Sequence, residues 1–218
     1  MQTRGTRFVL LLTAGWFLAA TAGLLLLADY DTQPGTPGQP PQHWPDEISL
    51  ARNSAQPTLL MFLHPRCPCS RASLAELARL ALRERDRLQF QVVFVQPAEV
   101  GVDWSQSDLW DSAVAHRDLH VVRDPGGVLA QSFGAATSGQ VLVYDRQGIL
   151  RFEGGITPGR GHVGDSFGSS LIPAIVAGQA PASPSRCATF GCPLSAQQAT
   201  AEKPAEASRR ASAPGPHG

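Results

Sequence analysis

Two cysteines one residue apart lie between a short apolar run and an amphipathic segment, and this junction restricts the possible folds more than any other feature of the chain. The run at 58–63, Thr-Leu-Leu-Met-Phe-Leu, is typical of a buried strand. Residues 70–87 are expected to form a helix, because apolar side chains recur there at helical spacing on one face: Leu74, Leu77, Ala78 and Ala81. The connecting residues 64–69 therefore place His-Pro-Arg-Cys-Pro-Cys at a strand-to-helix junction.

The start of a helix is a favourable place for a reactive thiol. Free amide N–H groups and the positive end of the helix dipole stabilise a thiolate there. Pro68 suits the first helical position, where a missing N–H costs nothing. We therefore expect Cys67 at the cap, exposed and nucleophilic, and Cys69 in the first turn, more covered and resolving. Arg66, and His64 when protonated, would add positive charge beside them.

The spacing of the pair leaves several interpretations open. Cys-x-Cys closes a tighter ring than the usual Cys-x-x-Cys, so a Cys67–Cys69 disulfide would be strained and easily reduced. Cys67 would otherwise form its disulfide with Cys192 or with a partner thiol. A second functional interpretation is a Cu(I) site, in which the two thiolates act with His64 or His162, because Cu(I) favours soft ligands. Two buried, inert cysteines are the purely structural interpretation.

The N-terminal segment sets the expected compartment. Residues 8–28 carry no charge and number about 21, enough to cross a bilayer as a helix. Arg4 and Arg7 precede the run and Asp29 follows it, so the positive-inside bias leaves residues 1–7 in the cytoplasm. A cleaved signal peptide is the alternative. Either way the rest of the chain reaches an oxidising space, which in a bacterium is the periplasm, and we expect an inner-membrane anchor.

Composition divides the remainder of the chain into three parts. Residues 29–45 are rich in proline and glycine and are expected to form a spacer. Residues 46–178 are expected to form the domain. Residues 179–218 are rich in alanine, serine and proline, and we expect a mostly disordered tail. This tail carries Cys187 and Cys192, for which a structural disulfide is one interpretation and a resolving role for Cys192 is another.

The order of the elements predicts an α/β fold with a mixed sheet and flanking helices. Further strands are expected at 90–95 and 121–122, further helices at 107–116 and 163–176, and a closing hairpin at 141–144 and 149–152. The early alternation of strands and helices implies parallel strands with crossover helices, and the hairpin adds antiparallel strands. Ser107 is expected to cap the helix that follows it.

The open ends of that hairpin should approach the thiols. Residues 136–139 enter the hairpin and residues 154–157 leave it. The chain then continues through Arg160, His162 and Asp165, which are candidates for activating a thiol or binding an anionic substrate. The alternative is that Asp165 caps the last helix and His162 packs locally.

Several of these segments together resemble the bacterial RedB-type thioredoxin-like proteins. The segments are His64 to Leu74, Thr137-Ser-Gly, Gly154-Gly-Ile-Thr with Arg160-Gly-His-Val-Gly-Asp, and Phe190-Gly-Cys-Pro-Leu. The resemblance covers roughly residues 45–194 and implies a thioredoxin-like fold with a redox role, and it makes Cys192 a stronger candidate. Thioredoxins usually carry a cis-proline in the loop that enters the hairpin, where backbone groups pair with a bound peptide. Ser138 or Gly139 stands in its place here.

Composition narrows the function further. The 18 basic and 18 acidic side chains balance, which argues against nucleic acid as the main partner. No glycine motif indicates NAD or flavin, so no cofactor is expected. We therefore predict a membrane-anchored, periplasm-facing thiol–disulfide oxidoreductase whose partners are periplasmic protein thiols or disulfides. The alternatives are a Cu(I) metallochaperone, a non-catalytic module and a peroxiredoxin-like thiol peroxidase, although His64 stands where that class usually has threonine.

Overall fold

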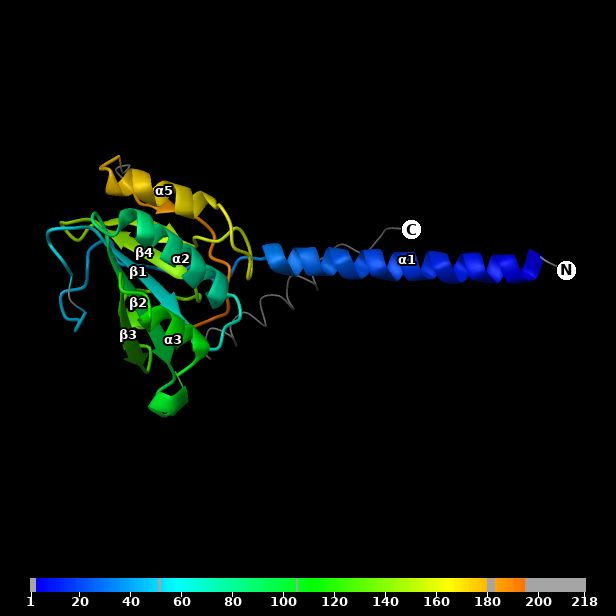
Figure 1. Cartoon of the computed structure of the whole chain (residues 1–218), viewed down its shortest axis with the longest axis horizontal. Helices are drawn as coiled ribbons and strands as arrows, with labels where there is room; N and C mark the ends of the chain where they lie inside the picture. Colours follow the sequence, from blue (N-terminus) through cyan, green and yellow to red (C-terminus); the bar gives the residue numbers. More distant parts are fainter. Residues whose placement is uncertain (1–2, 51, 105, 180–182, 195–218) are drawn as a thin grey trace, which may run out of the picture. The chain divides into compact units, whose positions relative to one another are not determined.

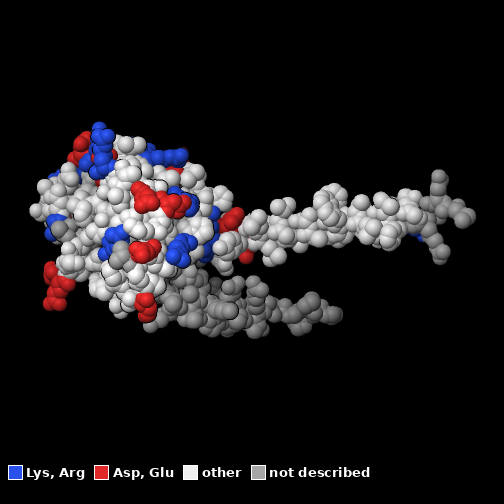
Figure 2. Space-filling model, turned by 60° about the horizontal axis from the view of Figure 1, so that its bottom comes forward, with Lys and Arg blue, Asp and Glu red and all other residues white. Residues whose placement is uncertain are grey.

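The computed structural model describes residues 3–50, 52–104, 106–179 and 183–194, and the chain divides into two units at Gln33 and Pro34. The first unit is a single helix, α1, from Thr3 to Thr32. Its span Gly5–Thr32 is long and apolar enough to cross a membrane, and a signal sequence would have the same character. Figure 2 shows charged side chains only toward the two ends of it.

The second unit is built on one mixed sheet. In the described part of the chain the strands are β1 (Thr58–Leu63), β2 (Gln89–Gln96), β3 (Leu119–Pro125), β4 (Gln140–Tyr144), β5 (Leu150–Gly154) and β6 (Ser185–Arg186), in the spatial order β3-β2-β1-β4-β5-β6. β1, β2 and β3 are parallel, whereas β4 is antiparallel to both β1 and β5. The predicted parallel start and antiparallel closing hairpin are confirmed.

Helices cover both faces of this sheet, and Figure 1 shows those that cover one face. Their bounds are α2 Ser70–Glu84, α3 Asp108–Val114, α4 Val128–Ser132 and α5 Phe167–Val176. Successive residues of β1 point to opposite faces. Leu59, Met61 and Leu63 pack in the core shared with α2, α3 and α5, whereas Leu60 and Phe62 pack in the core shared with α4. The two cores hold β1 fully buried, and β1 ends directly at the cysteine junction.

Side-chain caps fix where two of these helices begin. Ser107 accepts a hydrogen bond from the amide of Trp110 at 3.2 Å, which confirms the predicted cap of α3. At α5 the capping residue is Ser166, whose hydroxyl accepts from the amide of Ser169 at 3.1 Å. The alternative that gave this cap to Asp165 is wrong by one residue.

The proline-rich segment from Pro34 lies on the domain. The amides of Gly35, Gln39 and Trp44 donate to carbonyl oxygens of the domain, each at 2.8 Å. Tyr144 donates its hydroxyl to the Pro41 carbonyl at 3.0 Å. Prolines lack N–H groups and cannot join a regular ladder, but the remaining backbone groups of the segment still find partners on the domain.

Residues 183–194, which we call the tail segment, also lie on the domain. β6 pairs in parallel with β5, and the side chain of Leu194 is buried. This part of the chain was expected within a mostly disordered tail; residues 195–218 lie outside the described residues. Backbone pairing, the buried Leu194 side chain and an ion pair between Arg186 and Glu153 at 2.7 Å hold the segment.

Candidate functional site

The two junction cysteines lie before α2, which begins at Ser70, as the expected range 70–87 has it, and ends at Glu84. Cys69 is the residue before the first helical position, and the helix starts at Ser70. Tight turns precede it, because the amide of Cys67 donates to the His64 carbonyl and the amide of Ser70 donates to the Cys67 carbonyl, each at 3.1 Å. The prediction that Cys67 caps the helix is therefore wrong: Cys69 holds that position, and Cys67 lies in the turn before it.

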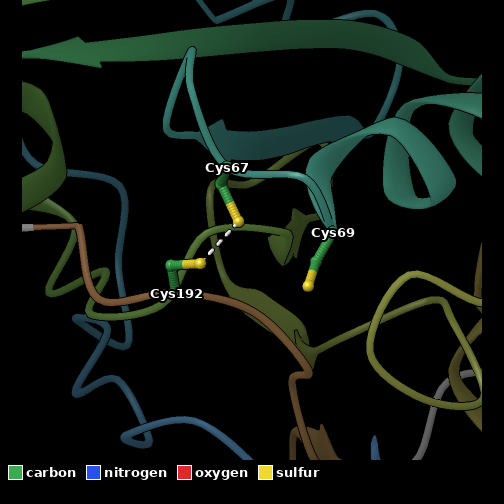
Figure 3. Close-up of side chains that lie close together, drawn as sticks. All are labelled: Cys67, Cys69 and Cys192. Carbon is green, nitrogen blue, oxygen red and sulfur yellow. Dashed lines mark hydrogen bonds between the residues drawn. The ribbon is translucent and has the colours of Figure 1, made fainter.

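Three sulfur atoms converge at this junction (Figure 3). The Sγ atoms of Cys67 and Cys192 lie 2.9 Å apart and point toward each other. The Sγ atoms of Cys67, Cys69 and Cys192 all lie within 4.8 Å of one another, and we call them the three-thiol cluster. Cys67 is only 4% exposed, whereas Cys69 is half-buried. The expectation that Cys67 is the exposed thiol is thus reversed, because Cys192 lies directly against it.

The tail segment reaches the cluster by pairing with the loop that enters the closing hairpin. The amide of Ser138 donates to the Cys192 carbonyl at 2.8 Å, and the amide of Leu194 donates to the Ala136 carbonyl at 2.9 Å. Thr137 and Pro193 form an antiparallel bridge between these bonds. The tail segment therefore lies antiparallel along the loop that enters the closing hairpin.

Glycines make this close approach possible. A Cβ atom on Gly191 would lie 1.9 Å from the carbonyl oxygen of Ser138, far inside any normal contact. Gly155 approaches the tail segment in the same way and donates its amide to the Ala188 carbonyl at 3.1 Å. Arg160 adds a side-chain contact, since its Nη1 donates to the Gly191 carbonyl at 2.6 Å. The position of Cys192 is thus fixed by backbone contacts on both sides.

Two buried serines connect the cluster to the end of β1. The Ser138 hydroxyl oxygen accepts from the amide of His64 at 2.8 Å and shares a hydrogen bond with the Ser70 hydroxyl at 2.7 Å. Ser70 in turn hydrogen-bonds the sulfur of Cys67. Sequence reasoning named Ser138 for its loop but missed Ser70, whose only sequence signal is its place directly after the second cysteine.

Hydrogen bonds, burial and nearby charges give the three thiols different pKa values. The pKa of Cys67 is lowered to about 4, chiefly by the hydrogen bond from the Cys192 thiol and, against the opposing effect of burial, by Ser70 and backbone amides. The same hydrogen bond raises the pKa of Cys192. Burial and then the Cys67 charge raise the pKa of Cys69. The positive charge of Arg160 opposes both of these increases.

His64 and Arg66, which were expected to place positive charge beside the cysteines, both contact the Trp104 ring. Burial lowers the pKa of His64, so its ring is neutral at pH 7, and its Nδ1 accepts from the amide of Arg66 at 3.2 Å. The ring packs edge-on against Trp104, with centroids 5.3 Å apart, and the guanidinium of Arg66 lies 4.9 Å from the same indole ring. Trp104, which sequence reasoning did not single out, therefore organises both side chains.

The remaining predicted residues lie apart from the sulfurs. His162 and Asp165 are exposed. In the described ranges the group of residues that could hold a metal ion is the three-thiol cluster, and neither His162 nor Asp165 belongs to it. Gly139 has φ +91° and donates its amide to the Phe62 carbonyl at 2.8 Å, beside the cluster's loop. Cys187 donates its thiol to the Gly155 carbonyl at 3.2 Å, so the structure contains no Cys187–Cys192 disulfide.

Comparison with known proteins identifies the fold. No family model and no curated protein sequence matches the chain. An uncharacterised conserved protein from Geobacillus kaustophilus superposes with a TM-score of 0.54 at 18% identity, covering 74% of this chain and 91% of that one. A hypothetical protein from Sinorhizobium meliloti gives 0.53 at 17% identity, with coverages of 75% and 96%. The exposed lipoprotein thioredoxin Etrx1 of Streptococcus pneumoniae gives 0.41 at 20% identity, with coverages of 57% and 86%.

Sequence identities this low support a conclusion about the fold alone. The parallel β3-β2-β1 arrangement continued by the antiparallel β4-β5 hairpin, with crossover helices between the parallel strands, is that of a thioredoxin-like fold, as predicted. Within it, the cysteines occupy the loop between the first strand and the first helix of the domain.

Proposed function

We propose that this chain is a thiol–disulfide oxidoreductase in which Cys67 is the attacking thiol and Cys192 the resolving thiol. The observation that carries the proposal is the 2.9 Å separation of their Sγ atoms. A disulfide requires about 2.05 Å between its sulfurs, so a movement of about 1 Å would close the bond. All four cysteines are free thiols in the structure, which corresponds to the reduced form of this pair.

Cys67 is suited to attack because it is the thiol that ionises most easily. Its lowered pKa rests chiefly on the hydrogen bond from Cys192, with further donation by Ser70. The thiolate is the nucleophile in disulfide exchange, so ionisation at neutral pH keeps Cys67 reactive. A thiolate of low pKa is also a good leaving group, which favours the return reaction from a Cys67 disulfide.

The chemistry then follows two exchange steps. The Cys67 thiolate attacks one sulfur of a partner disulfide, forming a mixed disulfide and releasing the other partner sulfur as a thiolate. The Cys192 thiolate next attacks the Cys67 sulfur, forming the Cys67–Cys192 disulfide and releasing the second partner thiol. The partner gains two electrons, and this pair of cysteines loses two. Run backwards, the same steps oxidise a partner dithiol.

Cys192 becomes a better nucleophile when it is needed. The largest cause of its raised pKa is the hydrogen bond to the Cys67 thiolate. That thiolate disappears in the mixed disulfide, so the pKa of Cys192 should fall at that stage, helped by the nearby Arg160 charge. Cys69 is a weaker candidate for resolution, since a Cys67–Cys69 ring would be strained.

The position of the tail segment indicates where a partner peptide would bind. The backbone of Ala136 and Ser138 is paired with Leu194 and Cys192, and Cys67 is buried beneath that contact. An external disulfide reaches Cys67 only after the tail segment lifts from this loop. This movement removes the Cys192 hydrogen bond and leaves Ser70, the Cys69 amide and the relief of burial to favour the Cys67 thiolate. The freed backbone groups then offer an extended partner peptide the same hydrogen bonds that the tail segment makes, so the tail segment acts as an internal substitute for the partner.

We further propose that residues 8–28 anchor the protein in the bacterial inner membrane with the domain in the periplasm. The apolar helix and the basic residues before it support this orientation. An oxidising compartment suits a thiol pair that exchanges with periplasmic protein thiols or disulfides. The RedB-type resemblance of the junction and of residues 190–194 agrees with this role.

Thiol trapping on the full chain tests the proposed pair. The protein is equilibrated in redox buffers of increasing oxidising strength, quenched with an alkylating reagent and mapped by peptide mass spectrometry. We expect Cys67 and Cys192 to become unreactive together and reversibly, and Cys192→Ser to accumulate a mixed disulfide on Cys67. Cys187→Ser, altered in the same segment, should titrate as the unmodified chain does. A reversible Cys67–Cys69 disulfide, or no reversible titration, would refute the assignment.

A further inference from the structure

The two-thiol exchange leaves one thiol of the cluster without a role. Cys69 contributes a third sulfur within 4.8 Å of the other two. It is half-buried and comes from the junction, whereas Cys192 comes from the tail segment. Figure 3 shows Cys69 beside Cys67 and Cys192, and the proposed exchange makes no use of its thiol.

The cluster offers a metal ion three ligand atoms, all of them sulfur. Among residues 3–50, 52–104, 106–179 and 183–194, no histidine or carboxylate joins the cluster as a fourth ligand. The nearest imidazole in sequence, His64, already uses its Nδ1 to accept from the Arg66 amide. Structural Zn²⁺ sites are almost always four-coordinate, so three thiolates fit zinc poorly. Soft thiolates without oxygen or nitrogen partners select Cu(I).

We propose that the reduced protein binds one Cu(I) ion through the sulfurs of Cys67, Cys69 and Cys192. This site differs from the one expected from sequence, because Cys192 takes the place that the sequence-based alternative gave to His162. His162 is exposed and stands outside the cluster, whereas Cys192 lies against Cys67. The inference does not require the proposed exchange reaction, since a ligand role needs only the three thiols.

A Cu(I) ion bound by three thiolates leaves a negative site, and the groups around the sulfurs stabilise negative charge. Three thiolates and one Cu(I) carry a net charge of minus two. Arg160 brings a positive charge beside the tail segment, since its Nη1 donates to the carbonyl of Gly191, the residue before Cys192, at 2.6 Å. Ser70 and the backbone amides of Cys69 and Cys192 donate hydrogen bonds to the Cys67 sulfur. These donors stabilise bound thiolates in the way that outer-shell partners stabilise metal ligands.

Binding and exchange would exclude each other at this site. Cu(I) enters without a change of oxidation state, and the thiols that are still protonated release their protons to solvent. Formation of the Cys67–Cys192 disulfide passes two electrons to the partner disulfide and removes two of the three ligands. The oxidised chain would therefore release the ion, so partner disulfides would act as competitors of copper.

The test is an anaerobic titration of the detergent-solubilised full chain, reduced by a non-thiol reductant, with Cu(I) supplied as its bicinchoninate complex. We expect one equivalent to be withdrawn from the chelator, and X-ray absorption to report sulfur ligands only. Cys69→Ser should weaken binding by more than about 100-fold, beyond the cost typical of losing an outer-shell partner. Cys187→Ser is the matched control and should bind as the unmodified chain does. His162→Ala should also leave the affinity unchanged.

The same variants separate this inference from the proposed exchange. Cys69→Ser retains Cys67 and Cys192, so it should still titrate reversibly in redox buffers while failing to hold Cu(I). Equal affinity of Cys69→Ser and the unmodified chain would overturn the three-thiol site, as would binding that persists after Cys67 and Cys192 are oxidised. Loss of redox titration with copper binding intact would instead overturn the exchange reaction alone.

Discussion

Replacing Cys192 by alanine or by serine should separate the effect of its hydrogen bond from the effect of its position. The Cys192 thiol is the largest cause of the lowered pKa of Cys67. Alanine removes that donor, whereas serine keeps a donating hydroxyl at the same place. We therefore expect the pKa of Cys67 to rise in Cys192→Ala and to stay low in Cys192→Ser.

The size of the effect follows from the strength of a charged hydrogen bond. Such a bond contributes about 1.5–3 kcal/mol, and about 1.36 kcal/mol corresponds to one pH unit. The pKa of Cys67, about 4 in the intact cluster, should therefore rise by roughly 1 to 2 pH units in the alanine variant. Opening the site to water acts in the opposite direction by relieving burial, which is the smaller cause.

The pH dependence of alkylation measures this directly. Only the thiolate reacts, so the alkylation rate falls about tenfold for each pH unit below the pKa. The assay follows carboxymethylation of Cys67 between pH 3 and 8 by mass spectrometry, and the midpoint gives the pKa independently of the plateau, which reports access. An alanine variant whose midpoint stays at or below that of the serine variant would refute the hydrogen-bond account of the lowered pKa.

Three further substitutions test how the site is held. Gly191→Ala places a Cβ against the Ser138 carbonyl; we expect stopped-flow thiol trapping to show Cys67–Cys192 disulfide formation slowed by up to about 100-fold, the cost of a 1 Å misplacement. Ser138→Ala removes the acceptor of the buried His64 amide and should lower the free energy of unfolding by about 1–3 kcal/mol in urea. Asp124→Ala, which frees two amides at the start of α4, should cost a similar amount.

Patterns of side chains predicted those parts of the fold that depend on side-chain burial. The apolar run of β1 and the helical spacing of α2 bracketed the cysteine junction, and the polar turn at Asp145 to Gly148 marked the closing hairpin. Each of these signals reflects a buried face with a fixed period. The start of α2 at Ser70 was predicted correctly, but Pro68 was wrongly given the first helical position, because proline there and proline in a preceding turn look alike in sequence.

Composition placed the tail segment in a mostly disordered tail and gave no sign of its backbone pairing, although its Leu194 side chain is buried in the core. Gly191 and Gly155 let the backbone of one strand lie against that of another, and hydrogen bonds between main-chain groups do the rest. Such contacts have no hydrophobic period, so composition placed this region in a disordered tail. The burial of Cys67 and the neutrality of His64 were missed for the same reason, since both depend on what covers the junction.

The missing proline in the hairpin-entering loop has a physical consequence in this structure. Ser138 or Gly139 stands in its place. Both amides are in use: Ser138 donates to the Cys192 carbonyl and Gly139 to the Phe62 carbonyl, each at 2.8 Å. Proline has no N–H, so at either position it would remove one of these bonds, and at position 138 it would also remove the hydroxyl that links His64 to Ser70. The departure from the thioredoxin pattern is therefore what allows the chain to pair its own tail segment beside Cys67.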